Sequence, residues 1–275
     1  MVASINGHEG HRKTTFGLTA PKPIALFHID PNTVEVVDKA ISTGEIDRSD
    51  VTLHPIEYPS SIFGGKDQIQ DDAHRAWTDD FVDPLRDTLE DSDVRSIVID
   101  TATELFELLM MADHGRTIQI LPEMRTKTNY KFKGLLQALK RSRKHIVLLH
   151  RVRDVWESSI IDTAKGKEEQ RNKVAGVFER EGFNKVGYHV NVEGYLMFDP
   201  AREGTLNNQY GLRVSRCTQR PSLVTRQPDE RAFWNLDSDD WWWGRAKIDG
   251  QRVHRASFTY LAMQVFEGTT PEDWQ

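Results

Sequence analysis

The fold is decided by the stretch Gly7-His-Glu-Gly-His-Arg-Lys-Thr-Thr15, which lies between a short predicted strand and a predicted helix. Glycines in such a turn let main-chain N–H groups wrap a phosphate chain, while a lysine neutralises phosphate charge and the next hydroxyl binds Mg²⁺. Gly7, Lys13 and Thr14 stand at the spacing of this phosphate-binding loop, the P-loop. The strict pattern has a second glycine directly before the lysine, where this chain has Arg12. The stretch therefore predicts a nucleotide-binding turn with one departure, the bland alternative being an ordinary glycine-rich turn. The predicted nucleotide-binding residues are Gly7, His8, Glu9, Gly10, His11, Arg12, Lys13, Thr14 and Thr15.

Two further strand ends are expected to complete this site. The apolar run Ile97-Val-Ile-Asp100 ends in a carboxylate, as does the Walker B strand that holds Mg²⁺ in P-loop proteins. We therefore predict that Thr14 and Asp100 hold the metal ion. The next predicted strand ends at His150, whose ring can donate a hydrogen bond to the γ-phosphate. The alternative for His150 is a strand-end histidine bonded to solvent or to the main chain.

Strand-like and helical segments alternate along the first 150 residues. Apolar strands are predicted at 2–5, 24–30, 96–100 and 145–150, and helices at 13–20, 32–43, 67–93, 104–112 and 131–143. This alternation predicts an α/β fold with a mainly parallel sheet covered by helices on both faces. From about Lys185 the pattern predicts antiparallel strands that extend the same sheet, with a last helix over 256–266. We expect a core over 1–200 and a C-terminal extension over 201–275 packed on it.

Two local features of these helices are also predicted. Asn32-Thr-Val-Glu35 has the pattern of a capping box at a helix start. Apolar residues recur every four positions from Ile69 to Leu85, which places an acidic segment on a helix that Pro84 bends or frays. The polar stretch 154–173 is expected to be a mobile loop.

Charge is segregated along the chain, although the total is modest. The sequence has 36 Lys and Arg against 42 Asp and Glu, a net charge of −6, so no chain-wide basic field attracts nucleic acid. Residues 67–93 carry ten acids against Arg75 and Arg86, a net charge of −8, whereas residues 125–153 carry ten Lys and Arg and no acid. A single cysteine, Cys217, excludes an internal disulfide framework and is typical of a reducing cytoplasm. Apolar runs stay below the roughly 20 residues that span a bilayer, and no signal peptide is recognised at the N-terminus.

The segments 13–30, 97–104 and 146–151 together resemble the phage-encoded RecA/RadA-like P-loop ATPases of the Sak type, which are linked to single-strand annealing and phage recombination. The segments 181–188 and 268–274 are similar to sequences of the same phage group. This resemblance implies a RecA-like core, ATP and Mg²⁺ as ligands, single-stranded DNA as partner and a homo-oligomer, either ring or filament. It also implies a location in the cytoplasm of a bacterial host.

Hydrolysis needs a group that positions water. Asp30, at the tip of the second predicted strand, is the candidate, although RecA-like proteins often have a glutamate two residues later, where this chain has Asn32. Glu104 is the other carboxylate near the Walker B strand, and its helix position favours a surface role. RecA-like oligomers often complete the site with a cation from a neighbouring subunit. Lys185 resembles such a residue, the alternative being a solvated surface lysine.

The basic segment is a candidate DNA surface, since Lys and Arg bind phosphates and interleaved aromatic rings stack on bases. Tyr130 and Phe132 are the candidate rings, in a part that looks loop-like over 125–133. The alternative is a solvated helix that pairs with the acidic segment, within the subunit or across an interface. The run Trp241–Trp243 favours packing over base stacking, and His8 with His11 is a weak metal signal. The predicted DNA-binding residues are Lys127, Lys131, Lys133, Lys140 and Arg141.

Two other functions compete with an ATPase that acts on DNA. Arg12 favours a P-loop protein that binds nucleotide without hydrolysis, or has lost it, and serves as a DNA-binding or scaffolding protein. A small-molecule kinase uses the same loop, and would transfer phosphate without any dependence on DNA.

Overall fold

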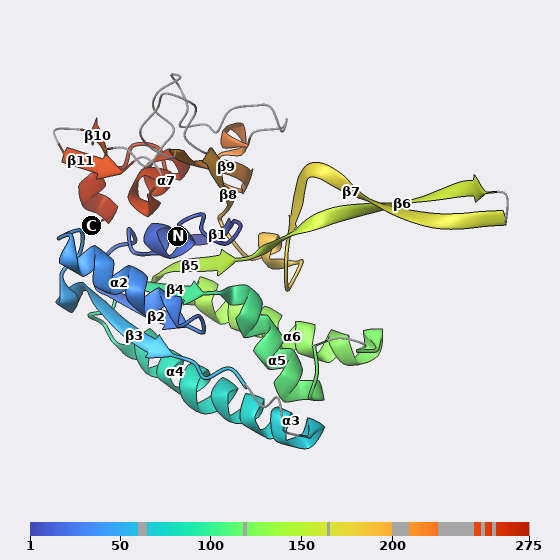
Figure 1. The fold of residues 1–275 in the computed structure, drawn as a ribbon. Coiled ribbons are helices and arrows are strands. Elements are labelled where there is room, and N and C mark those ends of the chain that lie inside the picture. The colour runs from blue at the N-terminus through green and yellow to red at the C-terminus, as the bar shows by residue number, and fades with distance from the viewer. Residues whose placement is uncertain are drawn as a thin grey trace.

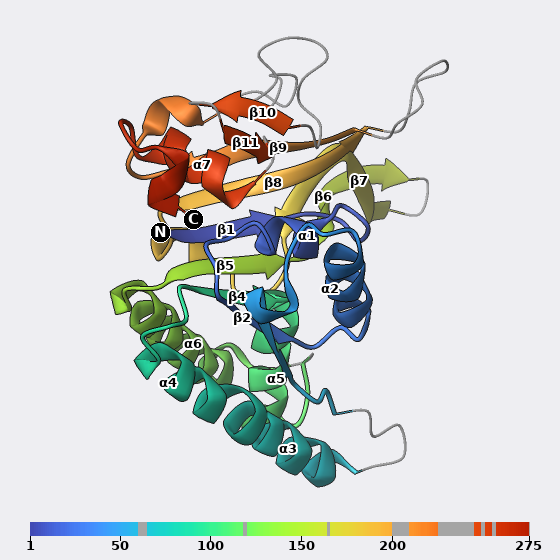
Figure 2. The ribbon, with the colours of Figure 1, turned by 90° about the vertical axis from the view of Figure 1, so that its left-hand side faces the viewer.

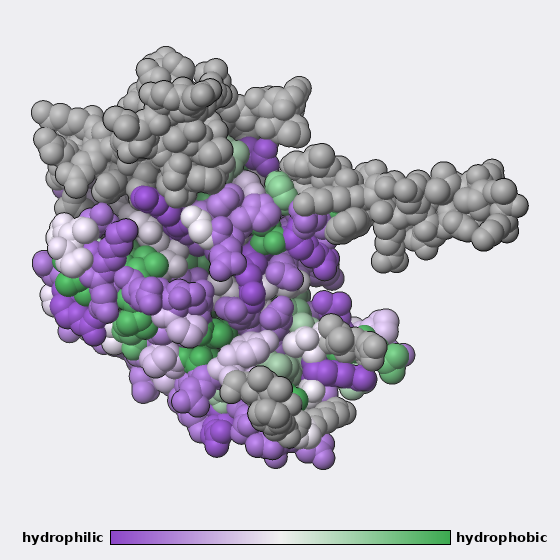
Figure 3. All heavy atoms as spheres, viewed as in Figure 1, coloured by the Kyte–Doolittle hydropathy of each residue, from purple (hydrophilic) through white to green (hydrophobic). Residues whose placement is uncertain are grey.

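The computed structural model describes residues 1–59, 65–117, 120–163, 166–199, 209–224, 245–248, 251–254 and 257–274. The run Trp241–Trp243 lies outside the described residues. Within the described part, no helix combines the length and the apolar character that a membrane crossing requires. On the face drawn in Figure 3, hydrophilic residues cover most of the described surface.

A seven-stranded sheet forms the centre of the molecule, in the order β3-β2-β4-β5-β1-β8-β9 (Figures 1 and 2). The first six strands in this order are parallel, and β9 is antiparallel to β8. The predicted α/β fold with a mainly parallel sheet is therefore confirmed. The strands are β1 (Val2–Asn6), β2 (Ile24–His28), β3 (Val51–Pro55), β4 (Ser96–Asp100), β5 (His145–His150), β8 (Val192–Asp199) and β9 (Gln209–Cys217).

The C-terminal strands differ from the expectation in one respect. The alternation that begins at Val186 does not form a strand, because Val186–Tyr188 is a 3-10 turn. The following strand, β8, runs parallel to β1, so only β9 makes the antiparallel extension.

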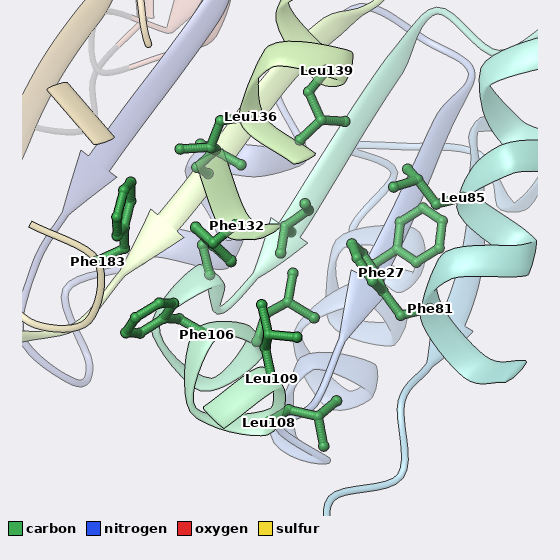
Figure 4. Packing of buried hydrophobic residues seen from close by; sticks show 14 of the residues in the cluster. Phe27, Phe81, Leu85, Phe106, Leu108, Leu109, Phe132, Leu136, Leu139 and Phe183 are labelled. Atoms are coloured by element: carbon green, nitrogen blue, oxygen red, sulfur yellow. The ribbon is translucent and has the colours of Figure 1, made fainter. Parts of the chain in front are cut away.

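Helices cover both faces of the sheet. On one face, α1 (Lys13–Gly17), α2 (Asn32–Ser42) and α7 (Phe258–Val265) contribute Phe16, Val37 and Phe258 to a shared apolar core. The other face carries α3 (Lys66–Arg75), α4 (Asp83–Glu90), α5 (Ala102–His114) and α6 (Pro122–Arg141). Figure 4 shows the packing on this second face, where the ring of Phe106 lies 5.1 Å from that of Phe132.

The acidic segment is helical, as expected, but its middle turn is wide. A π-helical stretch, Ala76–Val82, joins α3 to α4. In an α-helix, residues spaced by four drift around the axis by about 40° at each step, so an apolar row with that spacing turns away from the core. Wider π-type turns return the row to the sheet, and Phe81 and Leu85 are both buried. Pro84 lies just after the wide turn, in the first turn of α4, where its missing N–H costs least.

Three local expectations are wrong. Residues 125–133 are not a loop, because they belong to α6, whose buried residues Thr128, Phe132, Leu136 and Leu139 recur at helical spacing. Asn32 does not open a capping box, since the Asp30 carboxylate accepts the Asn32 N–H at 2.9 Å and takes over the capping. Within the stretch 154–173, residues 154–163 and 166–173 are not a loop either. They lie in the antiparallel strands β6 (Val152–Thr163) and β7 (Gly166–Arg180), which project from the body in Figure 1.

Residues from both predicted parts of the chain share one core. Leu212 of β9 and Phe258 of α7 are buried in the same cluster as Ile5 of β1. The Phe258 N–H also donates a hydrogen bond to the Thr19 hydroxyl at 2.8 Å. A second, two-stranded unit consists of β10 (Arg245–Ile248) and β11 (Gln251–His254). The division into 1–200 and 201–275 stays a prediction.

Candidate nucleotide-binding site

The main cavity lies at the carboxyl ends of the parallel strands, where ligands bind in open α/β sheets. Its volume is about 660 Å³, within the range of small-molecule sites. The P-loop lines one wall, and the residues that follow β2, β4 and β5 line the others. Its charged and hydroxyl-bearing residues are Glu9, Arg12, Lys13, Thr14, Thr15, Asp30, Thr33, Lys39, Thr43, Glu45, Asp100, Thr101, Glu104 and Arg151.

The P-loop is anchored at its start and open along its inner side. The Gly7 N–H donates to the His150 carbonyl at 3.2 Å, and the His11 N–H closes a turn onto the His8 carbonyl at 3.3 Å. Gly10 has a φ of 77°, which glycine adopts without strain. The main-chain N–H groups of Glu9, Gly10, Lys13 and Thr14 donate to no atom of the described residues. A row of free donors beside a lysine is what phosphate oxygens require.

Arg12 has a left-handed backbone conformation, which glycine adopts without strain. Its φ of 58° and ψ of 34° lie in the left-handed region, which costs an L-residue about 1–2 kcal/mol. The Arg12 side chain lines the cavity.

Lys13 bridges the loop from the inside. Its Nζ donates to the carbonyls of Gly7 and His8 at 2.9 and 2.8 Å. Burial lowers the pKa of Lys13, and the nearby Asp100 carboxylate opposes that shift. The ammonium group is thus held at the mouth of the turn, where a phosphate can replace the two carbonyls as its partner.

Thr14 and Asp100 meet as the sequence predicts. The Thr14 hydroxyl donates to Asp100 Oδ2 at 2.6 Å, and the Thr33 hydroxyl donates to the same oxygen at 3.2 Å. Burial raises the pKa of Asp100, while the two hydroxyl groups and Lys13 oppose the shift. An uncharged hydroxyl beside a buried carboxylate is an oxygen pair of the kind that Mg²⁺ prefers. The donor set therefore fits the metal ion that P-loop proteins use.

Two carboxylates stand near the tips of β2 and β4. Asp30 lines the cavity, with one oxygen occupied by the Asn32 N–H. Glu104 also lines the cavity, so the surface role favoured by its helix position is wrong, and its side chain is only 19% exposed. Arg151 binds Glu104 at 2.7 Å. Burial raises the pKa of Glu104, and the charge of Arg151 opposes that shift.

His150 reaches the site through its main chain, while its ring lies elsewhere. The ring is fully buried, and neither ring nitrogen has a hydrogen-bond partner among the described residues. Burial, with the positive charges of Arg180 and Lys13, lowers the pKa of His150 far below its usual value. His150 is not among the described residues that line the cavity, so its role as a γ-phosphate sensor stays a prediction.

The remaining predicted site residues lie away from the cavity. Lys185 is exposed before the 3-10 turn, and His11 donates from Nδ1 to the Leu196 carbonyl at 2.9 Å. The described residues hold no cluster of three potential metal ligands. The five predicted DNA-binding residues are all exposed on α6, although Lys131 is paired with Asp113.

The two aromatic candidates on α6 have separate roles. Tyr130 is 76% exposed, and the Lys133 ammonium lies 5.9 Å from the centre of its ring. Phe132 is buried in the core, so its predicted stacking on bases is wrong.

Thr33 is one of the cavity residues that sequence reasoning missed, and it is the one that contacts Asp100. It has no motif of its own, and the available signal was its position three residues after Asp30, in the first turn of a helix that follows a strand end.

No protein-family model and no curated protein matches this sequence. Among solved structures, the chain is similar to a KaiC-like protein from the hyperthermophilic archaeon Pyrococcus horikoshii, with 10% identity over 79% of each chain and a TM-score of 0.35. A likeness this distant does not establish a family. The P-loop strand β1 and the Asp100 strand β4 are separated by β5, with β2 and β3 beyond. The core is an α/β fold whose mostly parallel sheet is covered by helices on both faces.

Proposed function

We propose that this chain binds ATP with Mg²⁺ in the main cavity, hydrolyses it and acts on single-stranded DNA in phage recombination or annealing. The observation that carries the nucleotide part is the contact of 2.6 Å between Thr14 and Asp100, beside a loop of unpaired N–H groups. A hydroxyl beside a carboxylate supports metal binding and free N–H groups support phosphate binding, and Thr14 and Asp100 come from segments 86 residues apart.

Each residue of the site has a role in this proposal. The free N–H groups of the loop and the Lys13 ammonium bind the β- and γ-phosphate oxygens. Thr14 and Asp100 hold the metal ion. A bound Mg²⁺ ion supplies positive charge that offsets charge developing on the transferred phosphoryl group. Arg12 and Arg151 line the same cavity; Arg12 adds positive charge, while Arg151 is paired with Glu104.

Water attacks the γ-phosphorus in line with the leaving oxygen, and Asp30 orients that water. One Asp30 oxygen accepts the Asn32 N–H at 2.9 Å, which fixes the carboxylate and leaves its second oxygen for the water. The chemistry needs little beyond position and charge, because the transition state of phosphoryl transfer is stabilised electrostatically.

The DNA part of the proposal is supported by charge. The exposed cations of α6 form one basic face, and phosphate contacts from such residues give affinity without sequence preference. A homo-oligomer, ring or filament, would bring Lys185 of one subunit to the cavity of the next.

A second candidate keeps nucleotide binding and loses hydrolysis. The observation that favours it is that Glu104 is held by Arg151 at 2.7 Å and by the Thr101 hydroxyl at 3.2 Å, so that Asp30 alone remains to orient water. In that case the protein is a nucleotide-regulated DNA-binding or scaffolding protein.

Phosphate release and ATP binding, measured with and without single-stranded DNA, separate these functions. We expect DNA-stimulated release that Lys13→Ala abolishes, while Arg86→Ala, which removes an exposed cation on α4, leaves it intact. ATP binding without phosphate release would establish the second candidate. Phosphate transfer to a nucleoside, without dependence on DNA, would establish a kinase and contradict both.

A further inference from the structure

A second cavity, of about 400 Å³, lies between the β1-β8-β9 part of the sheet and the base of the β6–β7 hairpin. Its polar lining residues come from four strands: Asn6 from β1, Arg180 from β7, Glu193 and Tyr195 from β8, and Arg213, Ser215 and Arg216 from β9. None of these residues lines the main cavity, so the two cavities are separate.

A β-bulge turns two arginines toward the same face. In the β8–β9 ladder, Arg216 is opposite Glu193 and Val214 is opposite Gly194, so that Ser215 is the extra residue. In a regular strand, side chains three positions apart lie on opposite faces. The extra residue shifts the strand by one position, so Arg213 and Arg216 lie on the same face and both line the cavity, while Val214 stays in the core.

The cavity has a surplus of positive charge. Arg180 is paired with Glu193 and also donates to the Asn184 carbonyl at 2.9 Å. Arg213 and Arg216 make no ion pair with any residue in the described ranges, and this leaves two cations for an anionic ligand. Each lies over an aromatic ring, Arg213 at 5.8 Å from the centre of Tyr195 and Arg216 at 4.8 Å from that of Tyr188.

Buried polar atoms without partners gather beside this cavity. They include the amide oxygen of Asn6, Nε of Arg180 and both ring nitrogens of His150, counted against the described residues. Asn6 and His150 are neighbours across the β1–β5 ladder, and the Arg180 side chain is only 8% exposed. Buried polar groups are almost always hydrogen-bonded, so a cluster of orphans that includes two cavity-lining residues indicates a missing polar partner.

Aromatic rings complete the lining. Tyr195 and Phe178 lie with their planes 7° apart and their centres 6.1 Å apart. Aromatic side chains beside arginines bind nucleotides, because the base stacks on the ring and the guanidinium binds the phosphate.

We infer that this cavity binds a nucleotide unit, with its phosphate on Arg213 and Arg216 and its base against Tyr195 and Phe178. We take this nucleotide unit to be part of single-stranded DNA, and only this choice of ligand rests on the proposed function. A free nucleotide has the same chemistry. The inference adds a DNA contact outside α6, at the root of a hairpin that projects from the molecule (Figure 1).

The test is fluorescence anisotropy of a labelled oligo(dT) with the full chain, over a range of salt concentrations. The variant Arg213→Gln/Arg216→Gln removes both free cations. Its matched control, Arg48→Gln/Arg86→Gln, removes two arginines whose side chains are 67% and 64% exposed elsewhere. We expect the first variant to bind at least tenfold more weakly, and its salt slope to fall by about 0.7, since each neutralised phosphate of a single strand contributes about 0.7. The control keeps the wild-type affinity and slope.

The aromatic contact is tested separately. Tyr195→Leu is expected to weaken oligo(dT) binding about tenfold, whereas Tyr195→Phe, which keeps the ring, retains the wild-type affinity. Thermal unfolding followed by circular dichroism identifies any variant that fails to fold, and Phe178→Leu, which removes the other ring of the cavity and is also expected to weaken binding, replaces Tyr195→Leu if that variant is unfolded.

Three results would overturn the inference in part or whole. If dTMP binding is lost in Arg213→Gln/Arg216→Gln while oligo(dT) binding is unchanged, the cavity is a free-nucleotide site and DNA is the wrong source. Unchanged binding of both probes, or no binding of either by the wild type, refutes the cavity as a nucleotide site. ATP binding measured on the same preparations, with Lys13→Ala as its negative control, reports on the proposed ATP site independently.

Discussion

Relief of the backbone strain at Arg12 is expected to stabilise the chain. The left-handed conformation of Arg12 costs about 1–2 kcal/mol, and Arg12→Gly relieves this strain. Glycine, however, loses more chain entropy on folding, at a cost of about 0.5–1 kcal/mol. The net gain is about 0.5–1 kcal/mol. In a chain of 275 residues this raises the melting temperature by about 1–3 °C.

Arg12→Ala is the matched control, because it removes the guanidinium group and keeps the strained backbone. We expect Arg12→Gly to melt above Arg12→Ala in differential scanning calorimetry without nucleotide. Equal melting temperatures would refute the left-handed conformation at position 12. ATP titrations of the same two variants report on the Arg12 side chain. An equal loss of ATP affinity in both means that the guanidinium group binds phosphate, and an equal gain of affinity means that it obstructs the cavity.

Three further predictions follow from buried groups. Asp100→Asn keeps an acceptor for the two hydroxyl groups and removes a buried charge, so we expect the variant to melt no lower than the wild type in EDTA. Its Mg²⁺-dependent ATP binding is expected to be lost. A large drop in melting temperature would contradict the prediction. The pKa of His150 is lowered in the folded state, so below the unfolded pKa near 6.5 the unfolded chain takes up a proton that the folded chain does not. The free energy of unfolding is therefore higher at pH 8 than at pH 5. We expect His150→Leu to reduce this difference, as urea titrations at the two pH values measure. Phe132→Ala is expected to lower the free energy of unfolding by about 3–5 kcal/mol and Tyr130→Ala by less than about 0.5 kcal/mol, and similar losses would mean that α6 is wrongly oriented.

Much of the site could be predicted because its signals are local. The spacing of Gly7, Lys13 and Thr14 fixes one turn, and an apolar run that ends at Asp100 fixes one strand end. Because parallel strands present their carboxyl ends at one edge, these two local signals already bring the metal ligands together. Glu104 shows where this reasoning fails. Its exposure depends on Arg151, which reaches it from the end of another strand, and no local pattern reports that ion pair.

The missed elements have physical reasons. Residues 125–133 looked loop-like because charged and hydroxyl side chains surround Thr128 and Phe132, although these two already stand at helical spacing with Leu136. The hairpin of β6 and β7 was missed because its polar residues lack the apolar alternation of a half-buried strand. The second cavity depends on a bulge at Ser215, and nothing in the sequence around it marks the extra residue.

The two charged segments do not neutralise each other within the subunit. Among the described residues, no ion pair joins an acid of 67–93 to a cation of 125–153. The cations of Arg75 and Arg86 pair with acids of their own segment, and Lys131 pairs with Asp113 outside it. The surplus charge of α6 is therefore available to DNA phosphates or to the acidic helices of a second copy. Salt alone weakens both contacts, so added oligo(dT) distinguishes them: DNA on α6 would displace a neighbouring acidic helix and reduce the oligomer, whereas DNA in the arginine-lined cavity would leave it assembled.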